Sequence, residues 1–264
     1  MYSFWLSCLA SVFLSLFSGG KFTMIKHIDG KVNGISSDEL QNLYLIKNEV
    51  LEKYDASGSF LYSYSDNTLG PISFVDAADP MKPLVFYRAF AQFVVLDNTL
   101  TISGPPVPLQ NYGYEQVTLS CMSYDRGYWF YNPANFELVH MTSTDIAVDK
   151  TTGNISQLLG ISLHPNYLLE QNNKVFLNDP ETGILVFDVY GAYFKTLPIK
   201  GLNQFQVSGE KVIYLEGKKI RTYNFKTLED ETVPLPDSTA ISIRIEKERM
   251  FLQNDKGVDV YSVK

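Results

Sequence analysis

Cysteine is almost absent from this 264-residue sequence, which contains only Cys8 and Cys121. If the N-terminal segment 1–20 is removed, a single thiol remains, and one thiol cannot form an internal disulfide. Cys121 lies in the apolar strand-like run Val117–Met122. We therefore expect it to be buried and chemically inert rather than reactive.

A long basic run is also missing. The sequence has 22 basic and 29 acidic side chains, with a net charge of −7. Nucleic-acid binding needs a concentrated positive surface, so that class of function is disfavoured. The sequence has no Gly-rich phosphate loop, no Gly-x-Ser-x-Gly elbow and no His-Glu-x-x-His pattern. The spacing of its three histidines matches no metal motif, so we predict neither a cofactor nor a metal site.

Residues 1–20 carry no charge, and Tyr2–Phe17 is almost continuously apolar. The apolar run is short for a membrane-spanning helix and is followed by small residues. These features predict a signal peptide cleaved near Ser18–Lys21, and hence a secreted or periplasmic protein. Because a basic start is missing, an uncleaved membrane anchor is the alternative, and a true start at Met24 is a third.

The segment Lys174–Ile199 predicts the local fold most clearly. Three runs of β-branched and aromatic residues, Val175–Leu177, Ile184–Asp188 and Tyr193–Pro198, are separated by turns rich in Asn, Asp, Pro and Gly. Pro and Gly supply the dihedral angles that tight turns need. The pattern is typical of a meander of antiparallel strands.

A similar unit recurs along the chain at steps of roughly forty residues, the period of four-stranded propeller blades. Each unit contains a strand followed by a polar marker residue, at Asp55, Asp97, His140, Asp188, Asn224 and Ser262. An apolar strand precedes each marker by roughly ten residues. A two-sheet sandwich is the structural alternative, but it does not need a regular period.

The last unit stops at Lys264 after its third strand, and Phe22–Ile28 is a strand-like run without a partner. Lacing an N-terminal strand into the final blade removes exposed sheet edges. The sequence therefore predicts an all-β fold: a six-bladed β-propeller of four-stranded antiparallel blades, closed by an N-terminal strand, in one domain from 21 to 264. One helical turn is expected at Ile155–Leu159.

Two strings, YDASGSFLYSY at Tyr54–Tyr64 and VFDVYGAYFKTL at Val186–Leu197, carry a strand–Asp-x-x-Gly–strand hairpin. This hairpin resembles that of NHL-type and related six-bladed propellers, including secreted bacterial ones. The other units keep the shape but lose the glycine. The resemblance implies an architecture rather than a particular ligand.

Propeller ligands tend to bind over the central channel, where the loops that lead into the innermost strands converge. Amides, an aromatic ring and a few acids in those loops suit hydroxyl groups or a peptide backbone. The candidate binding residues are Asn33, Asn67, Tyr112, Glu115, His164, Asn166, Asn203 and Asp237.

The sequence favours a non-enzymatic propeller outside the cytoplasm that binds a protein partner or polysaccharide of the cell envelope at the channel mouth. Contact with a membrane is expected only through an uncleaved N-terminal segment. The alternative is a metal-dependent, lactonase-like hydrolase on the same scaffold. That reading requires Glu115, Asn166, Asn203 and Asp237 to converge around a divalent ion.

Overall fold

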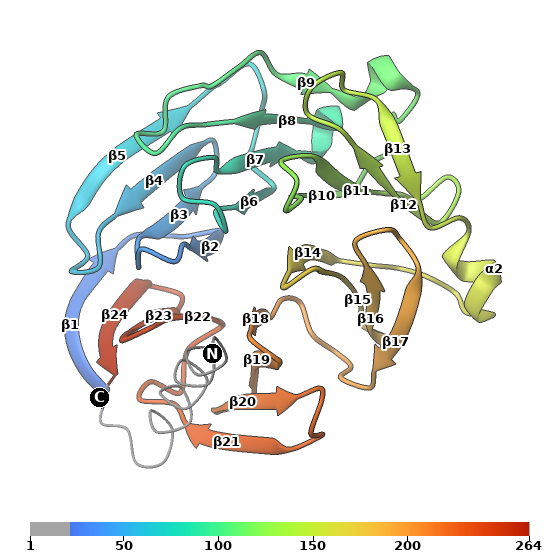
Figure 1. Ribbon diagram of the computed structural model, residues 1–264. Coiled ribbons are helices and arrows are strands. Elements are labelled where there is room, and N and C mark those ends of the chain that lie inside the picture. The colour runs from blue at the N-terminus through green and yellow to red at the C-terminus, as the bar shows by residue number, and fades with distance from the viewer. Residues whose placement is uncertain (1–21, 264) are drawn as a thin grey trace, which may run out of the picture.

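Six four-stranded antiparallel sheets stand around a central axis and form a β-propeller (Figure 1). The computed structural model describes residues 22–263. The predicted signal peptide or anchor at 1–20 lies outside them. Within the described part, helix is limited to α2 (Ile155–Leu159), as expected, and the short 3-10 turns η1 (Arg88–Phe90) and η2 (Leu109–Tyr112). No helix in 22–263 is long and apolar enough to cross a membrane.

Each blade is a meander that runs from the axis outward. Blades 1 to 3 consist of β2 (Gly34–Ser37), β3 (Leu43–Lys47), β4 (Val50–Tyr54) and β5 (Phe60–Ser65); β6 (Phe74–Asp76), β7 (Leu84–Tyr87), β8 (Gln92–Val95) and β9 (Val107–Pro108); and β10 (Leu119–Met122), β11 (Tyr128–Asn132), β12 (Glu137–Met141) and β13 (Val148–Thr151).

Blades 4 to 6 follow the same order. They consist of β14 (Tyr167–Gln171), β15 (Lys174–Asp179), β16 (Gly183–Asp188) and β17 (Tyr193–Leu197); β18 (Gln206–Ser208), β19 (Lys211–Glu216), β20 (Lys219–Asn224) and β21 (Asp230–Pro234); and β22 (Ser242–Glu246), β23 (Arg249–Gln253), β24 (Gly257–Val263) and β1 (Phe22–Asp29).

The N-terminal strand β1 pairs antiparallel with β24, from Phe22 opposite Val263 to Asp29 opposite Gly257. It occupies the fourth-strand position of blade 6, so the first and last parts of the chain share one sheet (Figure 1). Whether this strand is what keeps the ring stable is a separate prediction, which a truncation tests below.

The Asp-x-x-Gly hairpins have a simple physical basis. Asp188 Oδ1 accepts hydrogen bonds from the backbone N–H groups of Tyr190 and Ala192, both at 2.9 Å. Gly191 between them has φ 86°, a left-handed conformation that glycine adopts without strain. Asp97 makes the same two contacts, although Leu100, with φ 61°, replaces the glycine. In these two turns the aspartate, and not the glycine, is the shared feature.

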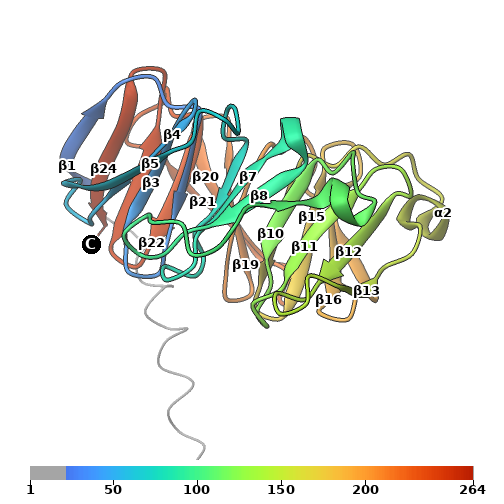
Figure 2. The ribbon, with the colours of Figure 1, turned by 90° about the horizontal axis from the view of Figure 1, so that it is seen from above.

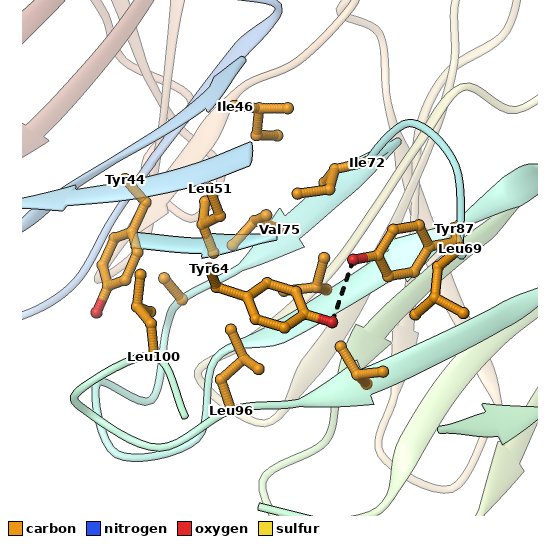
Figure 3. Packing of buried hydrophobic residues seen from close by; sticks show 13 residues of the cluster. Tyr44, Ile46, Leu51, Tyr64, Leu69, Ile72, Val75, Tyr87, Leu96 and Leu100 are labelled. Atoms are coloured by element: carbon orange, nitrogen blue, oxygen red, sulfur yellow. Dashed lines mark hydrogen bonds between the residues drawn. The ribbon is translucent and has the colours of Figure 1, made fainter. Parts of the chain in front are cut away.

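The hydrophobic core lies between the blades. Six clusters of buried residues each join two neighbouring blades. In the cluster between blades 1 and 2, Tyr44 and Leu51 pack with Val75 and Leu96 (Figure 3). Cys121 is fully buried between blades 3 and 4, as expected. Burial raises the pKa of its thiol, which keeps it unreactive.

Two of the six sequence markers were aligned wrongly. His140 lies inside β12 rather than after it, and Ser262 lies inside β24. The turn of blade 3 instead spans Thr142–Ala147, whose backbone is closed by a hydrogen bond from Thr142 N to Ala147 O. The period survives because the neighbouring strands still occur at the expected steps.

Candidate functional site

The ring has two faces, seen edge-on in Figure 2. The mouth face carries the connections from each outer strand to the next inner strand, at 30–33, 66–73, 109–118, 152–166, 198–205 and 235–241. The base face carries the turns that join the first strand to the second and the third strand to the fourth. Because β1 pairs antiparallel with β24 and leads through 30–33 into β2, it begins at the base face and ends at the mouth face.

A cavity of about 290 Å³ opens at the mouth of the channel. The polar side chains among its lining residues are four amides from the connections and two hydroxyl groups. They are Asn33, Asn166, Asn203, Gln204, Ser73 and Tyr167. None of the lining residues is acidic or basic. Amides both donate and accept hydrogen bonds, so this surface suits a neutral polar ligand.

The amides of the cavity differ in how they are held. Asn166 Nδ2 donates to Leu202 O at 3.0 Å, and Asn166 Oδ1 accepts from Asn178 Nδ2 at 2.6 Å. Asn33 Oδ1 accepts from Asn48 N at 2.9 Å. Asn203 is exposed and makes no side-chain hydrogen bond to any other residue in 22–263. Two amides are therefore fixed in position, and Asn203 is available to a ligand.

The structure brings three of the eight sequence-predicted residues to this cavity: Asn33, Asn166 and Asn203. The other five do not line it. Their positions are Asn67 in the 66–73 connection, Tyr112 in η2, Glu115 in the 109–118 connection, His164 beside Asp179, and Asp237 beside Thr239.

Only two of the four residues that the hydrolase alternative requires lie together. Asn166 and Asn203 share the mouth cavity, whereas Glu115 and Asp237 do not line it. Asp237 instead accepts hydrogen bonds from Thr239 and Asn254. Over the described residues, no group of three or more His, Cys, Asp or Glu side chains is placed to hold a metal ion.

Sequence reasoning missed a second set of polar residues, on the inner strands themselves. A base-side cavity of about 200 Å³ is lined by Asp76, Glu170, Gln206, Arg244 and Glu246, among others. The available signal was a polar residue within a short apolar run, as in SIRIE at Ser242–Glu246.

These inner-strand groups connect neighbouring blades. Glu246 Oε1 accepts from Ser37 Oγ of blade 1 and from Gln206 Nε2 of blade 5, both at 2.8 Å. Arg244 Nη2 donates across the channel to Tyr167 Oη at 3.2 Å. Burial raises the pKa of Glu246 to about 7, and the donors and Arg244 only partly oppose this.

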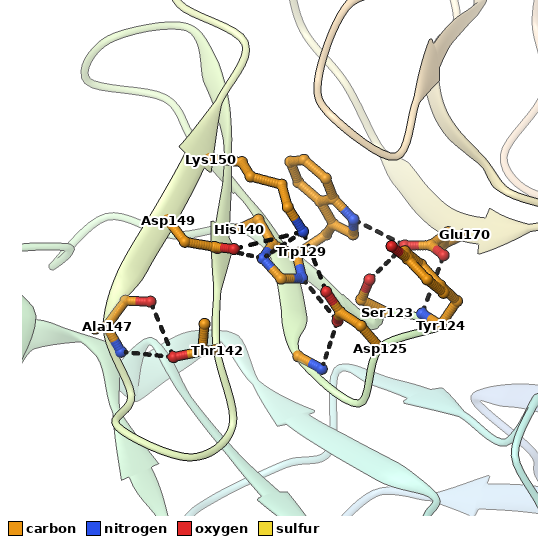
Figure 4. Close-up of polar contacts among 11 residues, drawn as sticks. Ser123, Tyr124, Asp125, Trp129, His140, Thr142, Ala147, Asp149, Lys150 and Glu170 are labelled. Carbon is orange, nitrogen blue, oxygen red and sulfur yellow. Dashed lines mark hydrogen bonds and ion pairs between the residues drawn. The ribbon is translucent and has the colours of Figure 1, made fainter.

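Asp76 and Glu170 join blade 3 to its neighbours. Asp76 Oδ2 accepts from Met122 N at 2.9 Å, and burial raises the pKa of this carboxyl against the effect of its hydrogen bonds. Glu170 accepts from Ser123 Oγ at 2.7 Å and from Trp129 Nε1 at 2.8 Å (Figure 4). Burial raises the pKa of Glu170 as well. Both carboxyl groups are used by structural contacts.

A charged cluster lies beside Trp129, whose ring centroid is 4.9 Å from that of His140 (Figure 4). The fully buried ring of His140 contacts Asp149 Oδ1 through Nδ1 at 2.5 Å and Asp125 Oδ1 through Nε2 at 3.1 Å. Lys150 Nζ lies 3.1 Å from Asp125 Oδ2. This network ties β12 and β13 to the β10–β11 turn. None of its charged members lines the channel cavities.

No protein family model matches the sequence, and no curated protein matches it in sequence. Solved structures do match in three dimensions. The Pan2 WD40 domain of Neurospora crassa is 8% identical, with a TM-score of 0.65 over 91% of this chain and 95% of that one. A streptogramin B lyase is 10% identical, with a TM-score of 0.61 over 93% and 98%.

A third match is the extracellular domain of a putative one-component system from B. thetaiotaomicron. It is 12% identical, with a TM-score of 0.55, and the alignment covers 88% of this chain and 32% of that one. At identities this low, the likeness establishes the fold alone. The chain is a six-bladed β-propeller, similar in fold to WD40 and streptogramin B lyase propellers.

Proposed function

We propose that this protein is a non-enzymatic propeller that acts outside the cytoplasm and holds a segment of a protein partner at the channel mouth. The observation that carries the proposal is the uncharged mouth cavity of about 290 Å³, in which fixed and available amides lie side by side. A peptide backbone presents one donor and one acceptor per residue, and amide side chains match both.

The rim of the mouth favours a protein over a polysaccharide. Phe90, Tyr112, Phe136 and Ile241 are 49%, 43%, 37% and 63% exposed, and all four lie in connections or turns of the mouth face. Large apolar and aromatic side chains around a polar centre are typical of protein interfaces. The aromatic pair within the mouth, Phe74 and Tyr167, packs edge to face at 5.5 Å, so their rings cover each other.

A location outside the cytoplasm rests on the uncharged, apolar segment 1–20. Fractionation of the native host followed by immunoblotting tests it, and recovery in the cytoplasmic fraction would contradict it.

The binding site is tested by partner capture from a cell-envelope extract with matched variants. Asn203→Ala removes the available amide, and Ile241→Ser removes an exposed rim side chain. Each should weaken binding of the captured partner by about tenfold or more if it belongs to the contact centre. Leu228→Ser is the control, because Leu228 is 66% exposed in the β20–β21 turn, on the opposite face of the ring.

Equal binding by all three variants would refute the mouth as the binding site. If the same variants instead abolish binding to a glycan array, the ligand is a polysaccharide and the protein-partner proposal fails.

A further inference from the structure

Large apolar side chains are exposed at the turn tips of the base face. Five hairpin turns, one in each of blades 1 to 5, present Leu40, Met81, Tyr124, Tyr190 and Leu228, which are between 55% and 71% exposed. Single exposed apolar residues are normal on any protein. One per blade around the same face of a ring is a repeated feature, which needs a cause.

The outer strands extend this apolar surface. Met24 and Ile25 lie in the first half of β1, Phe60 begins β5, and Phe194 is the second residue of β17. Their exposed fractions are 51%, 41%, 54% and 58%. These strand segments run from the base face, so the apolar side chains border the same end of the ring. Exposed apolar side chains gathered at one end of a molecule are found where proteins contact another protein or a membrane.

The chain itself indicates which of the two covers this face. β1 begins at Phe22 on the base face, and the preceding residues 1–20 are uncharged, with Tyr2–Phe17 almost continuously apolar. Only 18–21 separate this run from the ring, which limits the separation to roughly 14 Å when fully extended. If the apolar run is retained in a bilayer, the base face must lie at the lipid surface.

The length of the run strengthens this constraint. The apolar run Tyr2–Phe17 has 16 residues, fewer than the about 20 that span the hydrocarbon core of a bilayer. An apolar run this short leaves no extra residues between the hydrocarbon core and the propeller, so the ring is held close to the headgroups. Tyrosine and tryptophan are enriched at that level, and Tyr124 and Tyr190 are among the tips.

We propose that residues 1–20 are retained and that the base face of the propeller rests on a lipid bilayer, with its apolar turn tips immersed in the headgroup region. The mouth cavity then points away from the membrane. This inference does not depend on what the mouth binds.

The charge of the base face predicts the lipid preference. Its turns carry more acidic than basic side chains, with Glu39, Glu210 and Glu248 among the acids. A negative face is repelled by an anionic surface and gains nothing from it. Contact should therefore be stronger on phosphatidylcholine than on phosphatidylglycerol vesicles, the opposite of electrostatic adsorption.

The test uses the full chain in phosphatidylcholine vesicles, with an environment-sensitive fluorophore attached to single cysteines. Leu228→Cys and Tyr190→Cys place labels on the base face; Phe90→Cys and Tyr112→Cys place matched labels on the mouth face. All four carry Cys8→Ser, and the buried Cys121 does not react. Lipids brominated near the headgroup should quench the base-face labels by about half and leave the mouth-face labels unchanged.

Base-face labels that are quenched no more than mouth-face labels would overturn the proposal. So would mass spectrometry of the native protein showing that it begins after residue 20. Weaker quenching in phosphatidylglycerol vesicles is expected, and stronger quenching there would contradict the charge argument.

Discussion

Glu246 offers the sharpest quantitative test of how the channel is held together. Its carboxyl group lies at the end of β22 and accepts hydrogen bonds from blades 1 and 5. Burial raises its pKa from the ordinary value of 4.5 to about 7. A carboxyl group whose pKa is higher in the folded state than in the unfolded state contributes its full stability when the pH is below the unfolded-state pKa. This contribution is lost as the pH rises through the folded-state pKa.

The perturbation is Glu246→Gln, which keeps the shape and the accepting oxygen but cannot ionise. The difference between the two pKa values corresponds to about 3 kcal/mol of stability lost by the native protein between about pH 4.5 and pH 7. The partial exposure of the side chain reduces this figure, so we expect the variant to be more stable by about 1–3 kcal/mol at pH 8. At pH 4.5 both side chains are neutral, and the two proteins should have nearly equal stability.

The assay is urea unfolding of both proteins at intervals from pH 4.5 to pH 8.5, compared as a difference at each pH. The difference removes the contributions of other titrating groups, Asp76 and Glu170 included. Ser37→Ala is the matched control, because it deletes a donor that favours the charged form and should move the loss of stability to higher pH. A difference that stays constant across the range would refute the reasoning.

Three further predictions concern the blades. Deleting β1 (Phe22–Asp29) exposes the edge of β24, so the protein should melt at a lower temperature and aggregate. Calorimetry and size-exclusion chromatography check this prediction, and an unchanged melting curve would contradict it. Gly127→Ala places Cβ about 2.5 Å from Met141 O and should cost about 1–3 kcal/mol in urea unfolding, whereas Gly104→Ala, which meets nothing within 4 Å, should cost little. Trp129→Phe removes a donor to a buried carboxylate and should cost about 1–3 kcal/mol; an unchanged midpoint would show that this contact is replaced.

The architecture could be predicted because its signals are local. Each hairpin closes through contacts within a few residues, as Asp188 does with Tyr190 and Ala192, so the turns are visible in the sequence. His140 shows the limit of this approach. A polar residue at the expected step looked like the end of a strand, but its partners Asp125 and Asp149 lie across the blade and hold it inside. Only tertiary contacts distinguish a buried ionic network from a turn.

The mouth was located from the same period, because the connections into the inner strands recur with the blades. Which of their side chains face the axis depends on the path of each connection. Asn166 directly precedes β14 and lines the cavity, whereas Tyr112 lies in η2 and Glu115 lies four residues before β10, and neither lines it. A residue next to a strand has its direction set by that strand, and a residue farther from the strand does not.

The inner-strand residues explain why the interior of the channel is a poor candidate for binding, although it is lined by charged groups. Glu170 and Asp76 accept hydrogen bonds from residues of blade 3. Arg244 and Glu246 connect blades 4, 5, 6 and 1. A ligand that recruited these groups would have to replace contacts between blades, and leaving a buried charge unpaired is costly. Asn203 at the mouth carries no such cost. Binding is therefore expected at the mouth, where Asn203 is available to a ligand. The polar groups inside the channel instead hold neighbouring blades together.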